Sequence, residues 1–298
     1  MPTSYDALII GGSYAGLSAA LALGRSLRRV LVIDAGQPCN RFAKHSQNFL
    51  TQDGRPPGRI AADARAQIER YPTVRFVEEL ATDLRGEDGD FRVTTASGMT
   101  YRGKKLLFAT GLADELPELP GMMACWGKTV IHCPYCHGYD VKQRPTAVLI
   151  NNDHAPFMAR LVRNWTDELT LLTNGPAAFD VAEVTRIGVP VDERPLRELI
   201  HTNGVLQRVT FETGEALPVG AMYLHPRVSQ HCPLPERHGV ALAEHGLLRI
   251  DEAQSTSVAG IYAAGDCTTA FRSVANAVAQ GNRAAAMLNH ALVAEAYA

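Results

Sequence analysis

The pattern of apolar and polar positions near the N-terminus predicts a strand, a tight turn and a helix. Residues Tyr5 to Ile10 are mostly apolar, Gly11 to Gly16 are rich in glycine, and small or apolar residues dominate Leu17 to Leu27. A second apolar run, Val30 to Ile33, ends in Asp34. Strand, turn, helix and strand in this order predict a βαβ unit with a parallel sheet.

The same alternation recurs along the chain. Leu106 to Gly111 predicts a strand that runs into a small turn, and Ser257 to Asp266 predicts a strand before a long helix from about Ser273 to Val293. In the middle of the chain, a strand at Thr146 to Ile150 is followed by a turn and a helix at Pro156 to Trp165. Repeated strand and helix patterns predict the α/β class.

Composition and charge limit the classes of function. The 298 residues are enough for two domains of ordinary size. The net charge of -2 comes with lysine and arginine spread along the chain, so we expect no nucleic-acid partner. No apolar run approaches the roughly 18 residues of a spanning helix, and Met1 to Ser4 lead into the first strand without a secretion signal. We therefore expect a cytoplasmic protein that does not bind membranes.

The first turn carries the pattern of a dinucleotide-binding loop. Glycines at this position let the backbone approach a pyrophosphate, and the following helix N-terminus favours its negative charge. Asp34 lies 18 residues after Gly16, where an acidic side chain binds the ribose hydroxyls of an adenine dinucleotide. Ser13 replaces the second glycine of the motif, so a glycine-rich turn of another α/β sheet is the alternative.

Asp266 ends the predicted strand near the C-terminus. A carboxylate at a strand end, beside a helix N-terminus, can accept hydrogen bonds from a polyol chain, while the helix offers N–H groups to a phosphate or a flavin carbonyl. Thr110 and Gly111 mark a point where the chain could leave its first domain. For each of these segments alone, an ordinary sheet edge is the alternative.

Two of the six cysteines, Cys133 and Cys136, are separated by two residues. Thiols at this spacing can close into a disulfide and reopen, and the first cysteine of such a pair often has a lowered pKa. The pair is therefore a candidate redox centre. The other four cysteines are expected to be small packing residues: Cys39, Cys125, Cys232 and Cys267.

Metal binding is the competing interpretation of the cysteine segment. Zinc could use His132, Cys133, Cys136 and His137, but a structural zinc site normally takes its second ligand pair from a separate segment. The CxxCH pattern is also a c-type haem attachment signal, which requires export and a small helical cytochrome. We expect neither, and assign no metal.

Three strand-turn segments, with the cysteine pair after the second, resemble the low-molecular-weight thioredoxin reductase family over essentially the whole chain. The resemblance implies two Rossmann-like three-layer dinucleotide-binding domains. It implies a discontinuous FAD domain, 1–113 and 246–298, around a central NAD(P)-type domain, 114–245, that carries the cysteines. It also implies a homodimer.

By the same resemblance, the FAD-binding residues lie in the turns already described. Gln52 and Asp53, in the loop Asn48 to Gly54, are further candidates near the flavin, although that loop could equally be a plain surface turn. The remaining expected FAD-binding residues are Gly11, Gly12, Ser13, Gly16, Asp34, Thr110, Gly111, Gly265 and Asp266.

The central domain departs from the family pattern where NADPH would bind. Ile150, Asn151 and Asn152 stand where relatives have glycines, so side chains fill the space in which backbone would meet phosphate. The segment Leu171 to Gly175 has no arginine for the 2′-phosphate. We expect no conventional NADPH site. The His- and Pro-containing segment Leu224 to Pro233 is a candidate lining for the corresponding space.

His137 takes the place of an aspartate that usually follows the pair in this family. An imidazole with an ordinary pKa of about 6.5 can accept a thiol proton at neutral pH. A polar helix-start residue is the alternative role. CxxC followed by His-Gly resembles the gliotoxin- and holomycin-type dithiol oxidases, which pass electrons from flavin to dioxygen without consuming NADPH. By that likeness we expect Cys133 to meet a small-molecule or peptide dithiol and Cys136 to be the sulfur nearer the flavin.

Two other functions remain open at the level of sequence. The same parts run in reverse make a disulfide reductase, with a thioredoxin-like protein as substrate and NADPH, ferredoxin or a second flavin as donor. A non-catalytic FAD-binding or redox-sensing scaffold is the second. Motifs do not record the reduction potentials that set the direction of electron flow.

Overall fold

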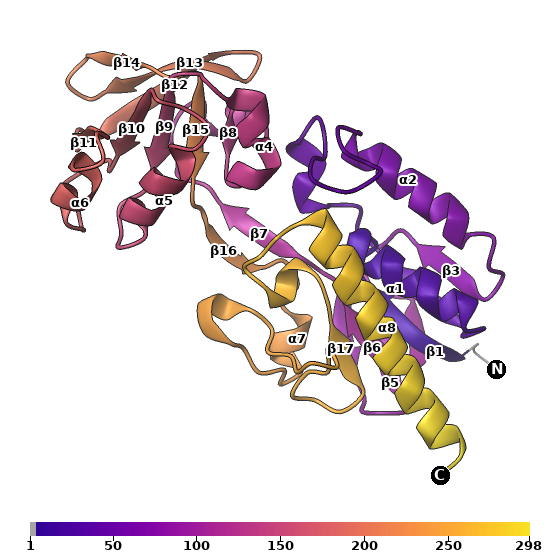
Figure 1. Ribbon diagram of the computed structural model, residues 1–298. Coiled ribbons are helices and arrows are strands. Elements are labelled where there is room, and N and C mark those ends of the chain that lie inside the picture. Colours follow the sequence, from indigo (N-terminus) through magenta and orange to yellow (C-terminus); the bar gives the residue numbers. More distant parts are fainter. Residues whose placement is uncertain (1–3) are drawn as a thin grey trace. The chain divides into compact units, whose positions relative to one another are not determined.

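A computed structural model describes residues 4–298, which divide into two compact units (Figure 1). The first, called the split unit, comprises residues 4–41, 49–114 and 228–298. The second, called the central unit, comprises residues 42–48 and 115–227. The connecting strands β7 (Leu112–Glu115) and β16 (Arg227–Gln230) pair with each other.

The units divide at 114/115 and 227/228, whereas the sequence suggested 113/114 and 245/246. The difference at the second boundary has a physical cause. Cys232, Leu234 and Val240 are buried against the sheet of the split unit, so this segment belongs to its core. Residues 42–48 belong to the central unit although they lie far from it in sequence.

The split unit contains a seven-stranded sheet in the order β3-β2-β1-β6-β5-β4, with β17 also paired to β6. The pairs of β1 with β2 and β6, of β2 with β3 and of β6 with β17 are parallel, and β4 and β5 are antiparallel additions. The strands are β1 (Ser4–Ile10), β2 (Val30–Ile33), β3 (Val74–Val77), β4 (Ala81–Arg85), β5 (Phe91–Thr95), β6 (Thr100–Phe108) and β17 (Ile261–Ala263).

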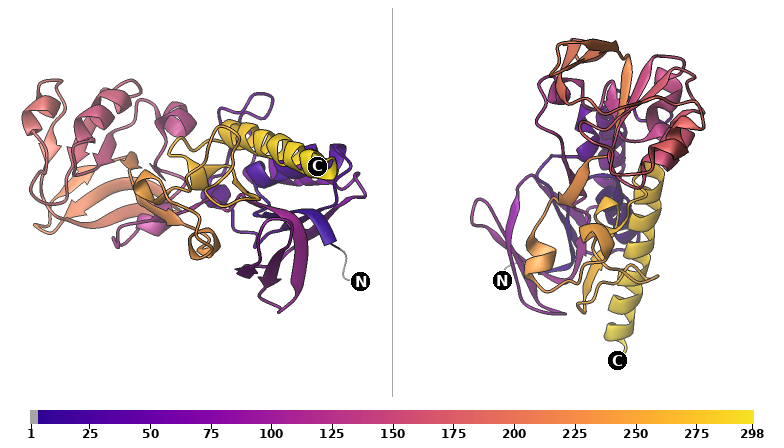
Figure 2. Two further views of the ribbon diagram at one scale, coloured as in Figure 1. Left: turned by 90° about the horizontal axis from the view of Figure 1, so that it is seen from below. Right: turned by 90° about the vertical axis from the view of Figure 1, so that its left-hand side faces the viewer.

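Alternation along β1 builds a core on each face of this sheet. Ala7 and Ile9 face one side, where helices cover them, and Leu8 and Ile10 face the other. Helix α8, the yellow helix in Figure 2, packs on α1. A side chain at Gly281 would overlap the backbone of Ala15. The helical elements are α1 (Tyr14–Arg25), α2 (Pro57–Ile68), α7 (Leu234–Arg237), α8 (Val274–Ala296) and the 3₁₀ turns η1 (Cys39–Phe42), η2 (Glu244–Gly246) and η3 (Asp266–Thr268).

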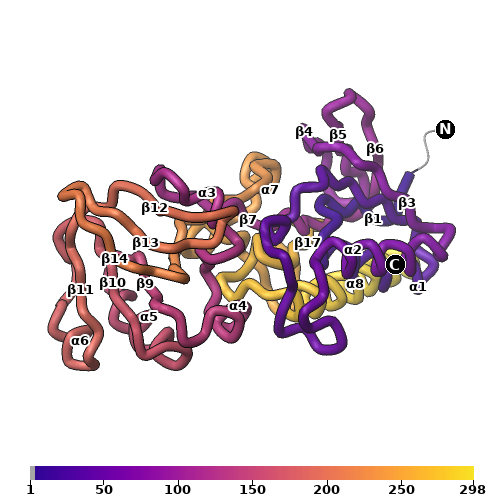
Figure 3. The backbone as a smooth tube through the Cα atoms, turned by 90° about the horizontal axis from the view of Figure 1, so that it is seen from above, coloured from indigo at the N-terminus to yellow at the C-terminus, as the bar shows by residue number. Residues whose placement is uncertain are grey.

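The central unit contains a parallel five-stranded sheet in the order β11-β10-β9-β15-β8. Its strands are β8 (Val130–Ile131), β9 (Thr146–Leu149), β10 (Leu169–Leu172), β11 (Val191–Asp192) and β15 (Ala221–Leu224). Its helices are α3 (Met122–Cys125), α4 (Pro134–Val141), α5 (Ala155–Val162) and α6 (Val181–Thr185). A separate antiparallel sheet consists of β12 (Leu196–Thr202), β13 (Val205–Phe211) and β14 (Ala216–Pro218) (Figure 3).

The predicted α/β class with two dinucleotide-type domains is confirmed, and most element boundaries shift by only a few residues. Helix α1 begins at Tyr14, inside the glycine turn, rather than at Leu17. The strand predicted from Ser257 is shortened to β17, because Gly260, with φ of +75°, turns the chain directly before it. None of the helices within residues 4–298 is long and apolar enough to cross a membrane.

Candidate active site

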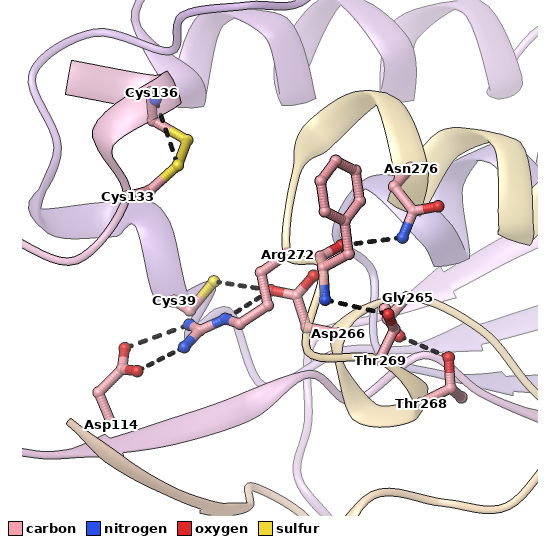
Figure 4. A network of polar contacts seen from close by, with 11 residues as sticks. Cys39, Asp114, Cys133, Cys136, Gly265, Asp266, Thr268, Thr269, Arg272 and Asn276 are labelled. Atoms are coloured by element: carbon pink, nitrogen blue, oxygen red, sulfur yellow. Dashed lines mark hydrogen bonds and ion pairs between the residues drawn. A yellow bond between two sulfur atoms is a disulfide. The ribbon is translucent and has the colours of Figure 1, made fainter. Parts of the chain in front are cut away.

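Cys133 and Cys136 form a disulfide at the start of α4 (Figure 4). Cys133 is the N-cap residue, and its Sγ accepts a hydrogen bond from the backbone N–H of Cys136 at 3.2 Å. Pro134 follows at the first helical position, where a missing N–H costs nothing. The helix N-terminus favours negative charge, so it stabilises a thiolate whenever the disulfide opens.

His137 lies in the first turn of the same helix, with its side chain 19% exposed. Burial lowers the pKa of its imidazole below the ordinary value, an effect that the charge of Asp140 partly opposes. The ring is therefore neutral at neutral pH. Its Nδ1 lies 4.0 Å from Oδ2 of Asp140, which is too far for a hydrogen bond.

Asp140 was not among the residues singled out from the sequence. It lies on the same face of α4 as His137, three residues on, and this spacing is a signal that sequence reasoning could have used. Gln47 donates hydrogen bonds from Nε2 to both carboxylate oxygens of Asp140, each at 3.3 Å. No local pattern reveals Gln47, because it comes from residues 42–48.

Gly138 has a packing role. A Cβ at this position would lie 2.8 Å from the indole ring of Trp165, so only glycine lets α4 approach that ring. The ring of Tyr135 meets Trp165 edge to face, with centroids 5.9 Å apart. The glycine of the His-Gly pair thus fixes how α4 sits in the central unit.

Glycines allow close backbone contacts within the predicted dinucleotide-binding turn of the split unit. Gly11 has φ of +104°, and a Cβ there would overlap the carbonyl oxygen of Ala109. A Cβ at Gly16 would overlap the carbonyl oxygen of Gly11. Ser13 is the N-cap residue of α1, where its carbonyl accepts from the N–H of Leu17. The glycines leave parts of this backbone without side chains, as close approach to a phosphate requires.

Asp34 directly follows β2 and lies against this turn. A Cβ at Gly12 would be 2.8 Å from the side chain of Asp34, so the carboxylate and the bare backbone are neighbours. This is the arrangement expected for an adenosine diphosphate group, with the ribose at the carboxylate and the pyrophosphate at the turn. The residues present in the split unit therefore fit the adenosine diphosphate part of FAD.

Gly265, Thr110 and Gly111 lie at the carboxyl ends of their strands. Gly265 has φ of +86°, and a Cβ there would be 3.0 Å from that of Ala15 in α1. Gly111 has φ of +66° and faces open space. Ala264 donates to the carbonyl of Phe108, so the ends of β17 and β6 lie together. The structure brings these predicted residues to the edge that also carries the glycine turn.

Asp266 belongs to a buried polar network (Figure 4). Arg272 donates from Nε to Asp266 at 3.3 Å and binds both oxygens of Asp114 at 2.6 and 3.2 Å. Burial raises the pKa of Asp266, while the guanidinium of Arg272 opposes that rise. Arg272 and Asp114 were missed from the sequence because 158 positions separate them.

Cys39 joins the same network, which differs from the apolar packing role expected for it. Its Sγ donates to Oδ2 of Asp266 at 3.6 Å, and burial raises the pKa of its thiol to about 11. Cys267 is fully buried, with a pKa raised to about 12 by burial, as suits a packing residue. Both thiols stay protonated at neutral pH and are poor nucleophiles.

Gln52 and Asp53 lie in a turn of the split unit. Oε1 of Gln52 accepts from Arg55 at 2.6 Å, and Arg55 also pairs with Asp63 of α2 at the same distance. The side chain of Gln52 is thus part of a local ion-pair cluster. A contact of Gln52 or Asp53 with the flavin stays a prediction.

The nucleotide turn of the central unit is filled by its own side chains. Asn151 donates to the carbonyl of Pro176 at 2.9 Å and accepts from the N–H of Ala178 at 2.7 Å. Oδ1 of Asn152 accepts from the N–H of His154 at 2.9 Å. The asparagines therefore tie down the turn and take up an N–H at the start of α5 that a phosphate would need.

Hydrogen bonds within the central unit also hold the loop after β10 in place. Oδ1 of Asn174 accepts from the N–H of Leu196 at 2.7 Å, and the hydroxyl of Thr173 donates to the carbonyl of Gly175 at 2.6 Å. Glu193 accepts from the N–H of Ala177 at 2.8 Å, which places a negative charge beside this loop. The acidic Glu193 disfavours the 2′-phosphate of NADPH, and the guanidinium of the adjacent Arg194 is already paired with Asp192 and Glu215.

The described residues give no support to a metal site. Within residues 4–298, no group of three or more His, Cys, Asp or Glu side chains is placed to hold a metal ion. The sulfurs of Cys133 and Cys136 are joined to each other, and His137 faces Asp140.

Two dinucleotide-type units and a disulfide at a helix N-terminus are the architecture of a disulfide oxidoreductase. The model of the pyridine nucleotide-disulphide oxidoreductase family matches residues 5–162 and 180–281. The chain belongs to this family and is a thioredoxin reductase-like flavoprotein oxidoreductase, which confirms the predicted family and enzyme class.

Individual relatives cover nearly the whole chain. "Thioredoxin reductase aclD" of Aspergillus oryzae is 30% identical over 94% of this chain and 94% of its own length. An oxidoreductase from Agrobacterium tumefaciens has a crystal structure that matches 98% of this chain and 99% of its own, with 38% identity and a TM-score of 0.92. The crystal structure of HlmI matches 100% of this chain and 96% of its own, with 32% identity and a TM-score of 0.94.

Proposed function

We propose that this protein is an FAD-dependent dithiol oxidase that makes disulfides through the Cys133–Cys136 pair, with dioxygen as final electron acceptor and without conventional use of NADPH. One observation carries the proposal. The asparagine-filled turn at Asn151 and Asn152 occupies the position of a phosphate-binding loop, while the redox pair and its neighbouring imidazole are intact. In the proposed reaction, electrons enter from the thiol side.

The thiol chemistry balances within the cysteine pair. A substrate thiolate attacks Sγ of Cys133, the Cys133–Cys136 bond breaks, and Cys136 leaves as a thiolate. The second substrate thiolate then attacks the substrate sulfur of the mixed disulfide and releases Cys133. The substrate has lost two electrons and two protons and gained an S–S bond, and the enzyme pair is reduced.

His137 is the group that receives a proton in these steps. Because burial holds its pKa below the ordinary value, the ring is neutral and able to accept at neutral pH. Asp140 lies on the Nδ1 side of the ring, which leaves Nε2 for the thiol proton. Gln47 holds the Asp140 carboxylate, so both act as positioning residues.

The split unit would hold the cofactor. The glycine turn suits the pyrophosphate, Asp34 the ribose and Asp266 the ribityl chain, with Arg272 hydrogen-bonded to the buried Asp266. When bound, FAD supplies a two-electron acceptor that reoxidises the cysteine pair and is itself reoxidised by dioxygen. The residues proposed to contact FAD are Gly11, Gly12, Ser13, Gly16, Asp34, Gln52, Asp53, Thr110, Gly111, Gly265 and Asp266.

Serine substitution of each cysteine tests the proposal. Cys133→Ser and Cys136→Ser should each abolish the loss of flavin absorbance that a dithiol causes under anaerobic conditions. Cys125→Ala, at a buried cysteine outside the pair, should leave that reaction unchanged. If both serine variants are still reduced by dithiol, the pair is not the redox centre and the proposal fails.

A disulfide reductase is the second candidate, because relatives such as that of Aspergillus oryzae are named thioredoxin reductases. The same sulfur steps run in reverse would need NADPH, ferredoxin or a second flavin as donor, with a thioredoxin-like protein as substrate. Release of thiols from a disulfide substrate, driven by one of these donors, would favour this function. We also propose a homodimer on the family resemblance, which light scattering of the purified protein tests.

A further inference from the structure

Three aromatic rings gather in the central unit at the carboxyl ends of β9 and β15. His154 is the N-cap residue of α5, Phe157 lies in the first turn of that helix, and His225 directly follows β15. The centroid of the His154 ring lies 4.9 Å from that of Phe157 and 5.7 Å from that of His225. All three residues are exposed, Phe157 by 52%. We call them the ring cluster.

The strand order places the ring cluster near the disulfide. Strands β8, β15 and β9 are neighbours in a parallel sheet, so their carboxyl ends share one edge. Tyr223 of β15 pairs with Ile131 of β8, and two residues further along lie His225 and Cys133. Adjacent strands are about 4.8 Å apart. The ring cluster therefore begins on the strand beside the one that leads into the cysteine pair.

The chemistry of this edge suits a neutral planar group better than a nucleotide. In open α/β sheets, ligands bind at the carboxyl ends of the strands. Here Asn152 takes up the N–H of His154, Glu193 accepts from the N–H of Ala177, and the adjacent Arg194 is already paired with Asp192 and Glu215. Partial desolvation of the ring and the proximity of His154 lower the pKa of His225, which favours its uncharged form at neutral pH. Aromatic rings offer faces and edges to another aromatic ring.

We propose that His154, Phe157 and His225 bind the ring of an aromatic dithiol and hold its two thiols within reach of Cys133. This inference rests on the proposed oxidase function and adds to it a class of substrate. The bound dithiol loses two electrons and two protons as its sulfurs join, and the Cys133–Cys136 bond is reduced to two thiols. The substrate class is thus a small planar dithiol rather than a protein.

Two dithiols that differ mainly in the ring provide the test. 1,2-Bis(mercaptomethyl)benzene and dithiothreitol both close to six-membered cyclic disulfides, but only the first has an aromatic ring. With the FAD-loaded protein, Phe157→Ala should raise KM for the aromatic dithiol by about 3–10-fold and leave kcat and the values for dithiothreitol unchanged. Val205→Ala, which truncates an exposed apolar side chain of β13, should change neither substrate. FAD content and melting temperature check that each variant is folded.

Calorimetric binding of the cyclic aromatic disulfide to the oxidised protein gives a readout without turnover. Its affinity should fall about 3–10-fold in Phe157→Ala and stay the same in Val205→Ala. If dithiothreitol is oxidised but the ring gives no advantage and Phe157→Ala has no effect, this inference is overturned and the oxidase stands. If neither dithiol is oxidised while the ring compound binds through Phe157, the proposed oxidase fails instead. Dependence of NADPH binding on Phe157 would overturn the inference in favour of a nucleotide site.

Discussion

At the scale of single residues, the proposed chemistry depends on His137. Its position in the first turn of α4 puts it beside the disulfide in sequence, and burial keeps its ring neutral when the solution is neutral. Asp140 stands on its Nδ1 side, and Gln47 fixes Asp140. Each of these side chains can be changed without touching the cysteines.

Replacement of His137 should slow thiol oxidation. Because a positioned base contributes about 10²-fold or more, His137→Ala should lower the rate of anaerobic flavin reduction by a dithiol by about that factor near pH 7. Stopped-flow absorbance measures the rate. The neighbouring exposed Tyr139 provides a control, since Tyr139→Phe should leave the rate unchanged. An unaltered rate in His137→Ala would make this histidine a structural residue only.

Replacement of Asp140 should move the pH profile. The pKa of His137 is lowered in the folded protein, so its base form persists as the pH falls below the ordinary value of about 6.5, and the acidic limb lies below that pH. Asp140 raises this pKa, so Asp140→Asn should lower it further and shift the acidic limb of kcat/KM to lower pH. Measurement of kcat/KM between pH 5 and 8 decides. A shift to higher pH would contradict the arrangement.

At the scale of elements, the glycine turn between β1 and α1 contributes most to the proposed FAD site. Gly16 lies in the first turn of α1, against the carbonyl of Gly11, and Gly265 approaches the same helix from the end of β17. The close contacts explain why these positions need residues without a side chain. They also keep the backbone open on the side where a phosphate would bind.

Addition of one methyl group at this turn should weaken FAD binding. In Gly16→Ala the new Cβ would overlap the Gly11 carbonyl, so the turn has to shift and the purified protein should hold substoichiometric FAD and melt at a lower temperature. The ratio of flavin to protein absorbance measures the loss. Gly58→Ala is the matched control, because nothing lies near that position in α2, and it should keep full FAD and equal or greater stability. Full flavin content in Gly16→Ala would contradict the predicted pyrophosphate position.

The elements that sequence could predict are those with local signals. The first βαβ unit, the strand β9 and the long helix α8 follow from apolar periodicity and glycine turns. The boundary near Val228 could not be predicted in this way, because it depends on which sheet Cys232 and Leu234 are buried against. Long-range partners such as Gln47 with Asp140 are invisible to periodicity for the same reason.

At the scale of the whole molecule, the two units belong to the same fold class, but the turns after β1 and β9 differ in their residues. The split unit keeps bare glycines at Gly11 and Gly16, whereas the central unit has Asn151 and Asn152 in the corresponding turn. The sheet of the central unit is complete in spite of this change, and Ile150, at the start of the turn, is buried in its core. The proposed loss of the NADPH site therefore does not require a change of fold.

The route by which electrons enter the flavin is the central claim, and anaerobic titration tests it most directly. The FAD-loaded protein is mixed first with NADPH and then with a dithiol while flavin absorbance is followed. We expect no bleaching with NADPH, bleaching with the dithiol, and return of the yellow colour with formation of peroxide when air is admitted. Fast bleaching by NADPH would contradict the account, because it would show a working nucleotide site in the central unit.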